Sequence, residues 1–128
     1  MTTPSQQFGR SAEELAEEWL RKKGYRILER NLRIGGGELD LVAQHHETLV
    51  FIEVKGRQTD QFGGAPYAIN GRKKRQIIKL ASCYLSQYGL SNQFCRFDVI
   101  LITGTNQGAP KLTHLEQAFE VSSSDWQW

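Results

Sequence analysis

Apolar residues recur along the chain at two spacings, and each spacing predicts a different element. A 3.6-residue spacing is typical of an amphipathic helix, whereas alternation with polar residues is typical of a strand. Helical spacing occurs in residues 11–23 and 72–88. Strand-like patterns occur in residues 25–32, 38–43, 49–55, 96–103 and 111–115. The expected order is therefore a helix, three strands, a second helix and two further strands.

Local signals mark the ends of the first helix. Ser11 and Glu14 have the S-x-x-E spacing of a capping box, so we expect the helix to begin at Ser11. Gly24 follows three basic residues and is expected to end it. Residues 56–71 are expected to form a long loop. The chain then divides into a flexible lead-in (1–10), a single domain (11–118) and a polar tail (119–128).

The order of elements predicts the fold class. Three consecutive strands with short connections favour an antiparallel meander, and the second helix then crosses over to a fourth strand. This arrangement is an α/β fold, with a mixed sheet between helices in a three-layer sandwich. The length of 128 residues suits one domain with its own core.

Composition predicts where the protein is located but does not identify its function. The net charge is only +2, so the position of the charges must decide whether nucleic acid is a partner. No apolar stretch approaches the roughly 18 residues of a membrane span. The first residues have no signal-peptide core, so we expect a cytoplasmic protein without a membrane partner. The two cysteines, Cys83 and Cys95, lack metal-site spacing and are expected to be reduced.

Four charged residues interrupt the second and third strand patterns. Glu53 and Lys55 lie within the apolar run LVFIEVK, and Glu38 and Asp40 lie in the strand before it. Charges are costly to bury unless they are paired or bind a metal. Strict alternation puts Glu53 and Lys55 on one face of the third strand. It also puts Asp40 on the face opposite Leu39, Leu41 and Ala43, so the hairpin is expected to bring Asp40 to Glu53 and Lys55, with Glu38 nearby.

This combination of side chains suits metal-assisted phosphodiester cleavage. Two close carboxylates repel each other unless a cation lies between them. Mg²⁺ binds through carboxylates, water and substrate phosphate, and a neighbouring lysine can orient water or stabilise a phosphate. The alternative is a solvent-facing salt bridge between Glu53 and Lys55. Asp40 on the preceding strand and the apolar character of the run favour a site.

Several motifs also resemble a known family. The motifs ELD at residues 38–40 and FIEVK at residues 51–55 resemble the PD-(D/E)xK nuclease signature. The flanking segments GGELDLVA, LVFIEVKGR, FGGAPYAI and RFDVILITG resemble the YraN-like family of uncharacterised bacterial proteins, which is similar to archaeal Holliday-junction resolvases. The resemblance covers residues 8–104. It implies a restriction-endonuclease-like fold and a Mg²⁺- or Mn²⁺-dependent DNA endonuclease, acting on branched or other non-duplex DNA.

The resemblance assigns roles to five positions. It implies that Asp40 and Glu53 bind metal, with the backbone carbonyl of Val54 as a further ligand. Lys55 matches the catalytic lysine. Glu13 matches a glutamate that resolvase-like members carry on the first helix, and helical geometry independently puts it at the border of the apolar face. A border salt bridge is the alternative for Glu13.

Two further positions remain ambiguous in sequence. Glu38 fits the G-E-x-D motif and could hold a second metal, orient the lysine or pair with a basic residue. Gly56 stands where family members often have threonine, so a hydroxyl that could contact metal or phosphate is missing. This departure supports an alternative function, a catalytically weak or inactive nucleic-acid-binding module. A third interpretation is a protein-interaction domain whose charges only stabilise the sheet.

Basic residues at the start of the second helix predict a nucleic-acid contact. Cations there oppose the helix dipole, and a bound phosphate would resolve that conflict. The alternative is a solvated basic face. Junction-cutting relatives work as dimers, so a homodimer is expected by analogy. The expected DNA-contacting residues are Arg57, Arg72, Lys73, Lys74 and Arg75.

Other polar residues are expected to have no catalytic role. Asp98 lies in a buried strand near a positive residue, so a structural hydrogen-bonding role is favoured. His45, His46 and His114 lack the spacing of metal ligands and are expected to be exposed.

Overall fold

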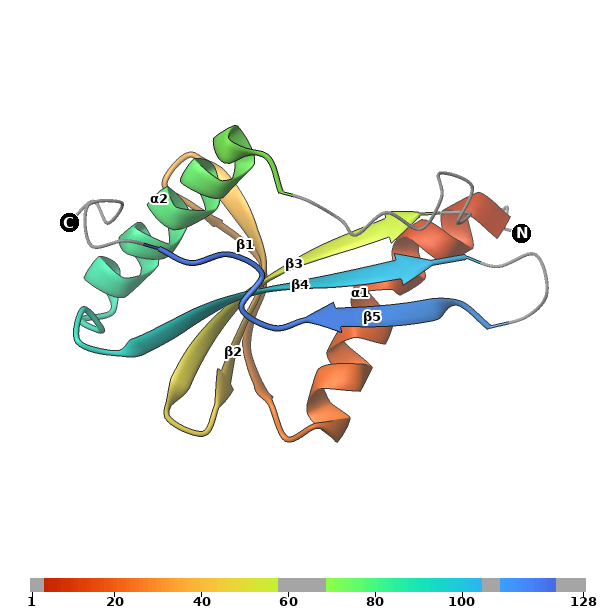
Figure 1. The fold of residues 1–128 in the computed structure, drawn as a ribbon, viewed down its shortest axis with the longest axis horizontal. Helices are drawn as coiled ribbons and strands as arrows, with labels where there is room; N and C mark the ends of the chain where they lie inside the picture. Colours follow the sequence, from red (N-terminus) through yellow and green to blue (C-terminus); the bar gives the residue numbers. More distant parts are fainter. Residues whose placement is uncertain (1–3, 58–68, 105–108, 122–128) are drawn as a thin grey trace.

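A computed structural model describes residues 4–57, 69–104 and 109–121, with side chains from residue 12 onward except that of Arg57. Figure 1 shows two helices packed against one twisted sheet. Neither helix in this described part is long and apolar enough to cross a membrane. The elements are α1 (Pro4–Lys22), β1 (Arg26–Ile34), β2 (Gly37–His45), β3 (Thr48–Arg57), α2 (Gly71–Gln87), β4 (Phe94–Thr103) and β5 (Lys111–Leu115).

The sheet has five strands in the order β1-β2-β3-β4-β5. The first three strands are antiparallel neighbours, as the short connections predicted. β4 then pairs parallel to β3, and β5 pairs antiparallel to β4. A parallel neighbour requires a crossover, which α2 provides. The expected α/β fold with a mixed sheet is therefore confirmed.

The two helices cover opposite faces of this sheet and create two apolar cores. Alternation along the strands sends neighbouring side chains to opposite faces, so β1 to β4 each contribute to both cores. Three layers result, with the sheet in the middle. The α1-side core contains Ala12, Ala16, Leu20, Leu41, Ala43, Val50, Ile52, Ile100 and Ile102. The α2-side core contains Leu39, Val42, Leu49, Phe51, Ile77, Ile78, Leu80, Ala81, Tyr84, Leu85 and Phe97.

The two ends of α1 differ in how well the sequence predicted them. At the carboxyl end, Gly24 has a φ of 90°, and the amide of Tyr25 donates to the carbonyl of Leu20 at 2.9 Å. This is the expected glycine-dependent helix stop. At the amino end the prediction was wrong, because α1 begins at Pro4 and Ser11 lies inside it. The expected lead-in is thus helical from Pro4 to Arg10.

The remaining boundaries agree with the patterns to within a few residues, and β5 spans Lys111–Leu115 as predicted. β3 extends to Arg57, so the expected loop begins later than residue 56. Most of that loop (58–68) and most of the expected tail (122–128) lie outside the described residues. Both cysteines are free thiols, as expected.

Candidate active site

Asp40 lies where the pairing of β2 and β3 ends. The register of the two strands runs from His45 opposite Thr48 to Leu41 opposite Ile52. One residue further out, the Asp40 carboxylate accepts a hydrogen bond of 2.9 Å from the amide of Val54. The side chain therefore reaches across to β3 and takes the place of a backbone acceptor.

This geometry corrects the predicted faces of β2. Leu39 packs in the α2-side core with Val42, whereas Leu41 and Ala43 pack in the α1-side core. The prediction that Leu39 shares a face with Leu41 and Ala43 was therefore wrong. Strict alternation slips by one position around Asp40, because its side chain lies toward the neighbouring strand instead of standing on a face.

Glu53 lies beside Asp40 and contacts α2. It follows Phe51 of the α2-side core by two residues on β3, so it points to the same face. The Nζ atom of Lys73 on α2 lies 3.3 Å from Oε1 of Glu53. The Glu53 side chain is 11% exposed and that of Lys73 is 43% exposed. Lys73 thus partly offsets the charge of a nearly buried carboxylate.

Nearby donors and positive charge compensate the negative charge of Asp40 only in part. The pKa of Asp40 is raised to about 6, mainly by burial and secondly by the neighbouring charge of Glu53. The Val54 amide and Lys73 act in the opposite direction on this pKa without cancelling the rise. We call Asp40 and Glu53 the acid pair. A cation that binds between the two carboxylates would relieve their repulsion, and oxygen ligands of this kind suit Mg²⁺ or Mn²⁺.

The other two predicted catalytic residues, Lys55 and Glu13, lie on different elements, β3 and α1. Lys55 follows Glu53 by two residues toward the exposed end of β3, on the same face of the strand. Glu13 is half-buried on α1, and α1 covers the face of the sheet opposite Lys73. Within the described residues, no three acidic, histidine or cysteine side chains converge enough to hold a metal. The acid pair is therefore brought together without Glu13.

Glu38 and Gly56 lie at the edges of the site. Glu38 is opposite Arg33 on β1, and the Nε atom of Arg33 lies 3.9 Å from a Glu38 oxygen. Of the three roles considered for Glu38, the structure shows the pairing with a basic residue. Gly56 is exposed near the end of β3. Arg57 ends that strand, and its side chain lies outside the described residues.

The basic residues at the start of α2 lie in different surroundings. Lys73 contacts the acid pair, whereas Nζ of Lys74 lies 5.6 Å from the ring centre of Phe119. Arg72 and Arg75 are exposed. Asn70 caps the helix, because its side-chain oxygen accepts from the Lys73 amide at 2.8 Å. We did not identify Asn70 in the sequence, although asparagine is a preferred cap residue.

A second polar cluster lies on the α1 side of the sheet, centred on Asp98. The Asp98 side chain is fully buried and accepts two hydrogen bonds of 2.9 Å from Arg96. The amide of Gln117 adds a third at 3.0 Å. Together with His114, these partners hold the pKa of Asp98 below its usual value although burial raises it. The predicted structural role of Asp98 agrees with this geometry.

His114 belongs to the same cluster, so the prediction that it is exposed was wrong. Its side chain is 3% exposed, and Nε2 lies 2.8 Å from Oδ2 of Asp98. Nδ1 accepts a hydrogen bond of 3.2 Å from Nε1 of Trp19. Because an indole nitrogen can only donate, Nδ1 must carry no proton. In this tautomer Nε2–H donates to Asp98.

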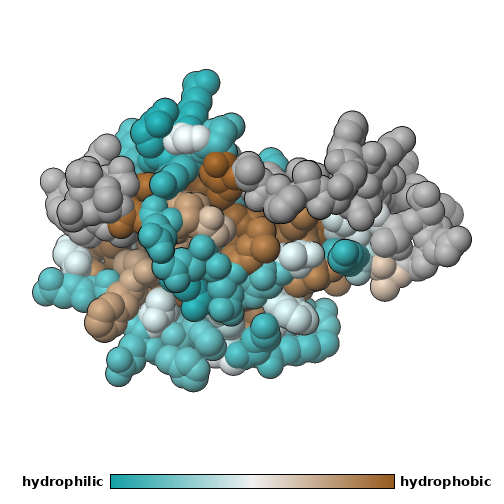
Figure 2. All heavy atoms as spheres, in the orientation of Figure 1, coloured by the Kyte–Doolittle hydropathy of each residue, from teal (hydrophilic) through white to brown (hydrophobic). Residues whose placement is uncertain are grey.

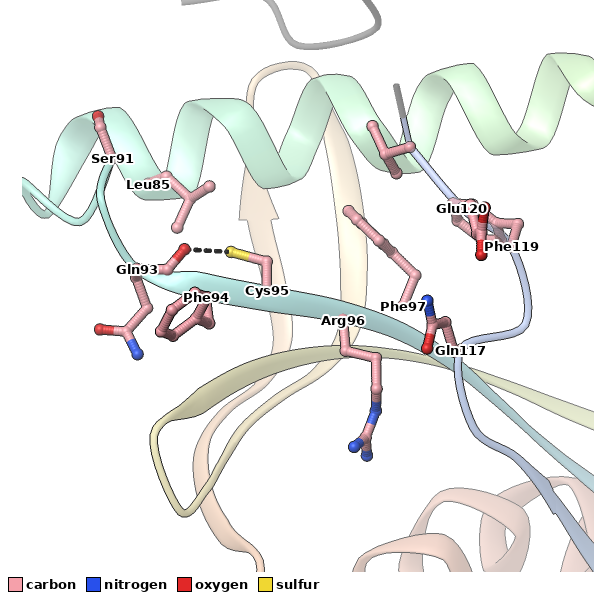
Figure 3. A pocket seen from close by; sticks show the side chains of 11 residues that line it. Leu85, Ser91, Gln93, Phe94, Cys95, Arg96, Phe97, Gln117, Phe119 and Glu120 are labelled. Carbon is pink, nitrogen blue, oxygen red and sulfur yellow. Dashed lines mark hydrogen bonds between the residues drawn. The ribbon is translucent and has the colours of Figure 1, made fainter. Parts of the chain in front are cut away.

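A separate hollow of about 390 Å³ lies between β4, the end of α2 and residues 117–121. Figure 3 shows Leu85, Cys95 and Phe97 pointing toward one another here, whereas Arg96 points away. Burial raises the pKa of the Cys95 thiol to about 11. A thiol with this pKa is a poor nucleophile at neutral pH, so the hollow offers no chemistry like that of the acid pair.

Comparisons with known proteins show which family this chain is similar to. Residues 12–102 match the model described as "Uncharacterised protein family UPF0102". A UPF0102 protein of Hahella chejuensis is 51% identical over 94 residues, covering 73% of this chain and 76% of that protein. One from Geobacter sulfurreducens is 43% identical over 115 residues, covering 90% of each. A structure titled as Pyrococcus furiosus SfsA in complex with Ca²⁺ is similar at 15% identity, with a TM-score of 0.44, and the match covers 91% of this chain and 65% of that one.

Proposed function

This chain belongs to the uncharacterised protein family UPF0102, and we propose that it is a divalent-metal-dependent endonuclease that cuts DNA. The observation that carries the proposal is the acid pair. Two carboxylates are held together at the end of a strand pairing, one by a backbone amide and one by Lys73. A fold that only needed stability would gain nothing from opposing two carboxylates. The raised pKa of Asp40 is the electrostatic consequence of this arrangement.

Each residue of the site has a role in this proposal. Asp40 and Glu53 would hold Mg²⁺ or Mn²⁺, with the Val54 carbonyl as a further ligand. When bound, the ion supplies Lewis-acid activation of the phosphate and a lowered pKa for a bound water. Lys55 would orient that water or stabilise the phosphate. Lys73 keeps the pair partly neutralised before an ion competes for Glu53.

Cleavage assays with labelled substrates test the proposal. The protein is incubated with junction, flap, single-stranded and duplex DNA in Mn²⁺, Mg²⁺ or EDTA. We expect metal-dependent cleavage that falls at least 100-fold in Glu53→Gln and Lys55→Ala, since each removes a group at the reacting phosphate. Glu18→Gln, on the exposed surface of α1, is the matched control. Cleavage that survives both site substitutions would show that these residues do not form the active site.

A second candidate function is a nucleic-acid-binding module with negligible cleavage. The observation that favours it is that, among the residues that the structure describes, only two acids converge, and Lys73 already pairs with one of them. Gly56 also removes a hydroxyl beside the site. Binding of DNA in EDTA with no cleavage of any substrate in Mn²⁺ would select this function over the endonuclease.

A further inference from the structure

A shallow basic groove lies between the β1–β2 turn and α2. Two adjoining hollows form it and share Gly35 and Gly36. One, of about 580 Å³, is lined by residues 33–38, and the other, of about 250 Å³, is lined also by Arg75, Gln76, Lys79 and Leu80. Figure 2 shows hydrophilic residues gathered at the top of the view, over the start of α2. We call this surface the turn groove.

Glycine residues make the turn groove possible. A Cβ atom on Gly35 would lie 2.9 Å from Sγ of Cys83, and one on Gly37 would lie 2.8 Å from Nε2 of Gln76. The turn therefore packs directly against α2 with its backbone. Gly36 is different, because a Cβ atom there would meet nothing within 4 Å. At Gly36 the turn therefore has an open backbone surface, the glycine wall, that a ligand can approach closely.

The charge of the turn groove is mainly positive. Arg33, Arg75 and Lys79 are all exposed, and the Arg33 side chain is 90% exposed. Among its lining residues Glu38 is the single acid, and it already lies 3.9 Å from Arg33. Exposed cations along a concave surface favour a polyanion over a small neutral ligand.

The turn groove also leads to the acid pair. Lys73, which contacts Glu53, and Gln76, which lies against Gly37, are one helical turn apart on α2. From Lys73 to Lys79 the helix rises about 9 Å, which is the axial rise of roughly two to three nucleotides in one strand. On the other wall, β2 runs from Gly37 to Asp40. Both walls therefore run from the turn groove toward the acid pair.

We propose that the turn groove holds the phosphate backbone of one DNA strand and leads that strand to the acid pair. The proposal rests on the proposed function, because it names the path of the same substrate. Arg33, Arg75 and Lys79 contact the phosphates, and the glycine wall lets the backbone approach. Contacts of this kind carry no sequence information, so binding is salt-dependent and tolerant of sequence.

Binding without cleavage tests this path. Anisotropy of a labelled single-stranded oligonucleotide is measured in EDTA for the wild type, Arg75→Glu/Lys79→Glu and the control Arg26→Glu/Lys111→Glu. Both double variants change the net charge equally, and Arg26 and Lys111 are exposed away from the groove. We expect about tenfold or greater loss of affinity for the groove variant only. Its salt slope should fall by about 1.4, from two lost single-strand phosphate contacts.

Substitutions at Gly36 separate local charge from fold. Gly36→Asp and Gly36→Asn have nearly the same shape, and both residue types tolerate the positive φ of 84° found there. We expect only the aspartate to weaken binding, by several-fold. Equal weakening in both double variants, or no effect of the Gly36→Asp charge, would overturn the path. This binding assay is independent of the cleavage assay. A protein that binds DNA through the turn groove but cleaves no substrate would contradict the proposed endonuclease and leave the proposed path intact.

Discussion

Asp40 on β2 and Asp98 on β4 lie on either side of β3, and burial raises the pKa of both carboxyls, yet the net shifts have opposite signs. Asp98 faces Arg96, His114 and the Gln117 amide, and its pKa is lowered. Asp40 faces Glu53, and the Val54 amide and the partly exposed Lys73 oppose the rise to about 6 without cancelling it. The opposite signs of the two pKa shifts therefore follow from the different partners of the two carboxylates.

This difference distinguishes a structural acid from a poised one. Where a buried carboxylate has a complete set of hydrogen-bond donors, removal of one partner strongly destabilises the folded protein. A carboxylate set against another carboxylate is strained in the metal-free protein, and strain of this kind is concentrated at functional sites. Measurements of stability can test the distinction without any assumption about substrate.

Removal of Asp98 should produce the largest effect. Asp98→Ala leaves the largely buried Arg96 guanidinium without a carboxylate partner, so we expect the free energy of unfolding to fall by about 3–5 kcal/mol. Urea denaturation at pH 7 measures this loss. A loss below about 1 kcal/mol would show that the Asp98 cluster holds the fold no more strongly than the acid pair does.

Addition of a divalent cation should have the next largest effect, through the acid pair. At a Mn²⁺ concentration 100 times the dissociation constant, we expect the free energy of unfolding to rise by about 2.7 kcal/mol. Glu53→Gln should abolish this gain, because one of the two carboxylates is lost, whereas Glu18→Gln should retain it. Thermal unfolding with and without Mn²⁺ provides the measurement, and an unchanged midpoint in the wild type would contradict a metal site.

Neutralisation of Asp40 should stabilise the metal-free protein. The folded pKa of about 6 lies above the unfolded value of 3.8, so the wild type loses stability as pH rises through this range. Asp40→Asn removes the titration and keeps an oxygen for the Val54 amide. We expect a gain of about 1–2 kcal/mol above pH 6 that shrinks toward pH 4. Urea denaturation in EDTA across this range measures it, and a loss of stability at pH 7 would contradict the strained-pair interpretation.

Removal of Lys73 should have the smallest effect on stability and a clear effect on titration. Because its side chain is 43% exposed, we expect Lys73→Ala to cost less than about 1 kcal/mol. Its positive charge lowers the pKa of Asp40, so the variant should titrate above about pH 6. Carboxyl carbon NMR follows this titration. Lys74→Ala is the control, since Lys74 lies over Phe119. An equal change in the pKa of Asp40 in this control would show that Lys73 does not act on Asp40 through its position beside the acid pair.

Features set by periodicity could be predicted from the sequence. Residues 111–115 form β5 as expected, and the helix predicted from Arg72 begins at Gly71, because alternation and helical spacing record which side chains are buried. The meeting of Asp40 and Glu53 followed from a short hairpin. Their roles in catalysis, and those of Lys55, Val54 and Glu13, remain predictions.

Features set by single tertiary contacts could not be predicted. The slip at Asp40 depends on one side chain that bonds to the Val54 amide, and a period-2 pattern contains no trace of it. The burial of His114 depends on Trp19, which lies 95 residues away in sequence. At Ser11 a valid capping pattern was present, but the helix continues through it to Pro4. Local patterns therefore predicted the elements and missed the contacts that join them.

The hydrogen bond between Trp19 and His114 has a consequence for the order of folding. Its 95-residue separation contrasts with the 14 residues between Asp40 and Val54. Contacts between distant residues must overcome a larger loop-closure entropy, so the hairpin of the acid pair forms first. During synthesis on the ribosome, that hairpin waits several seconds for β5 to emerge. We therefore expect the bond between Trp19 and His114 to form after that hairpin, and interactions formed after the transition state act chiefly by slowing unfolding.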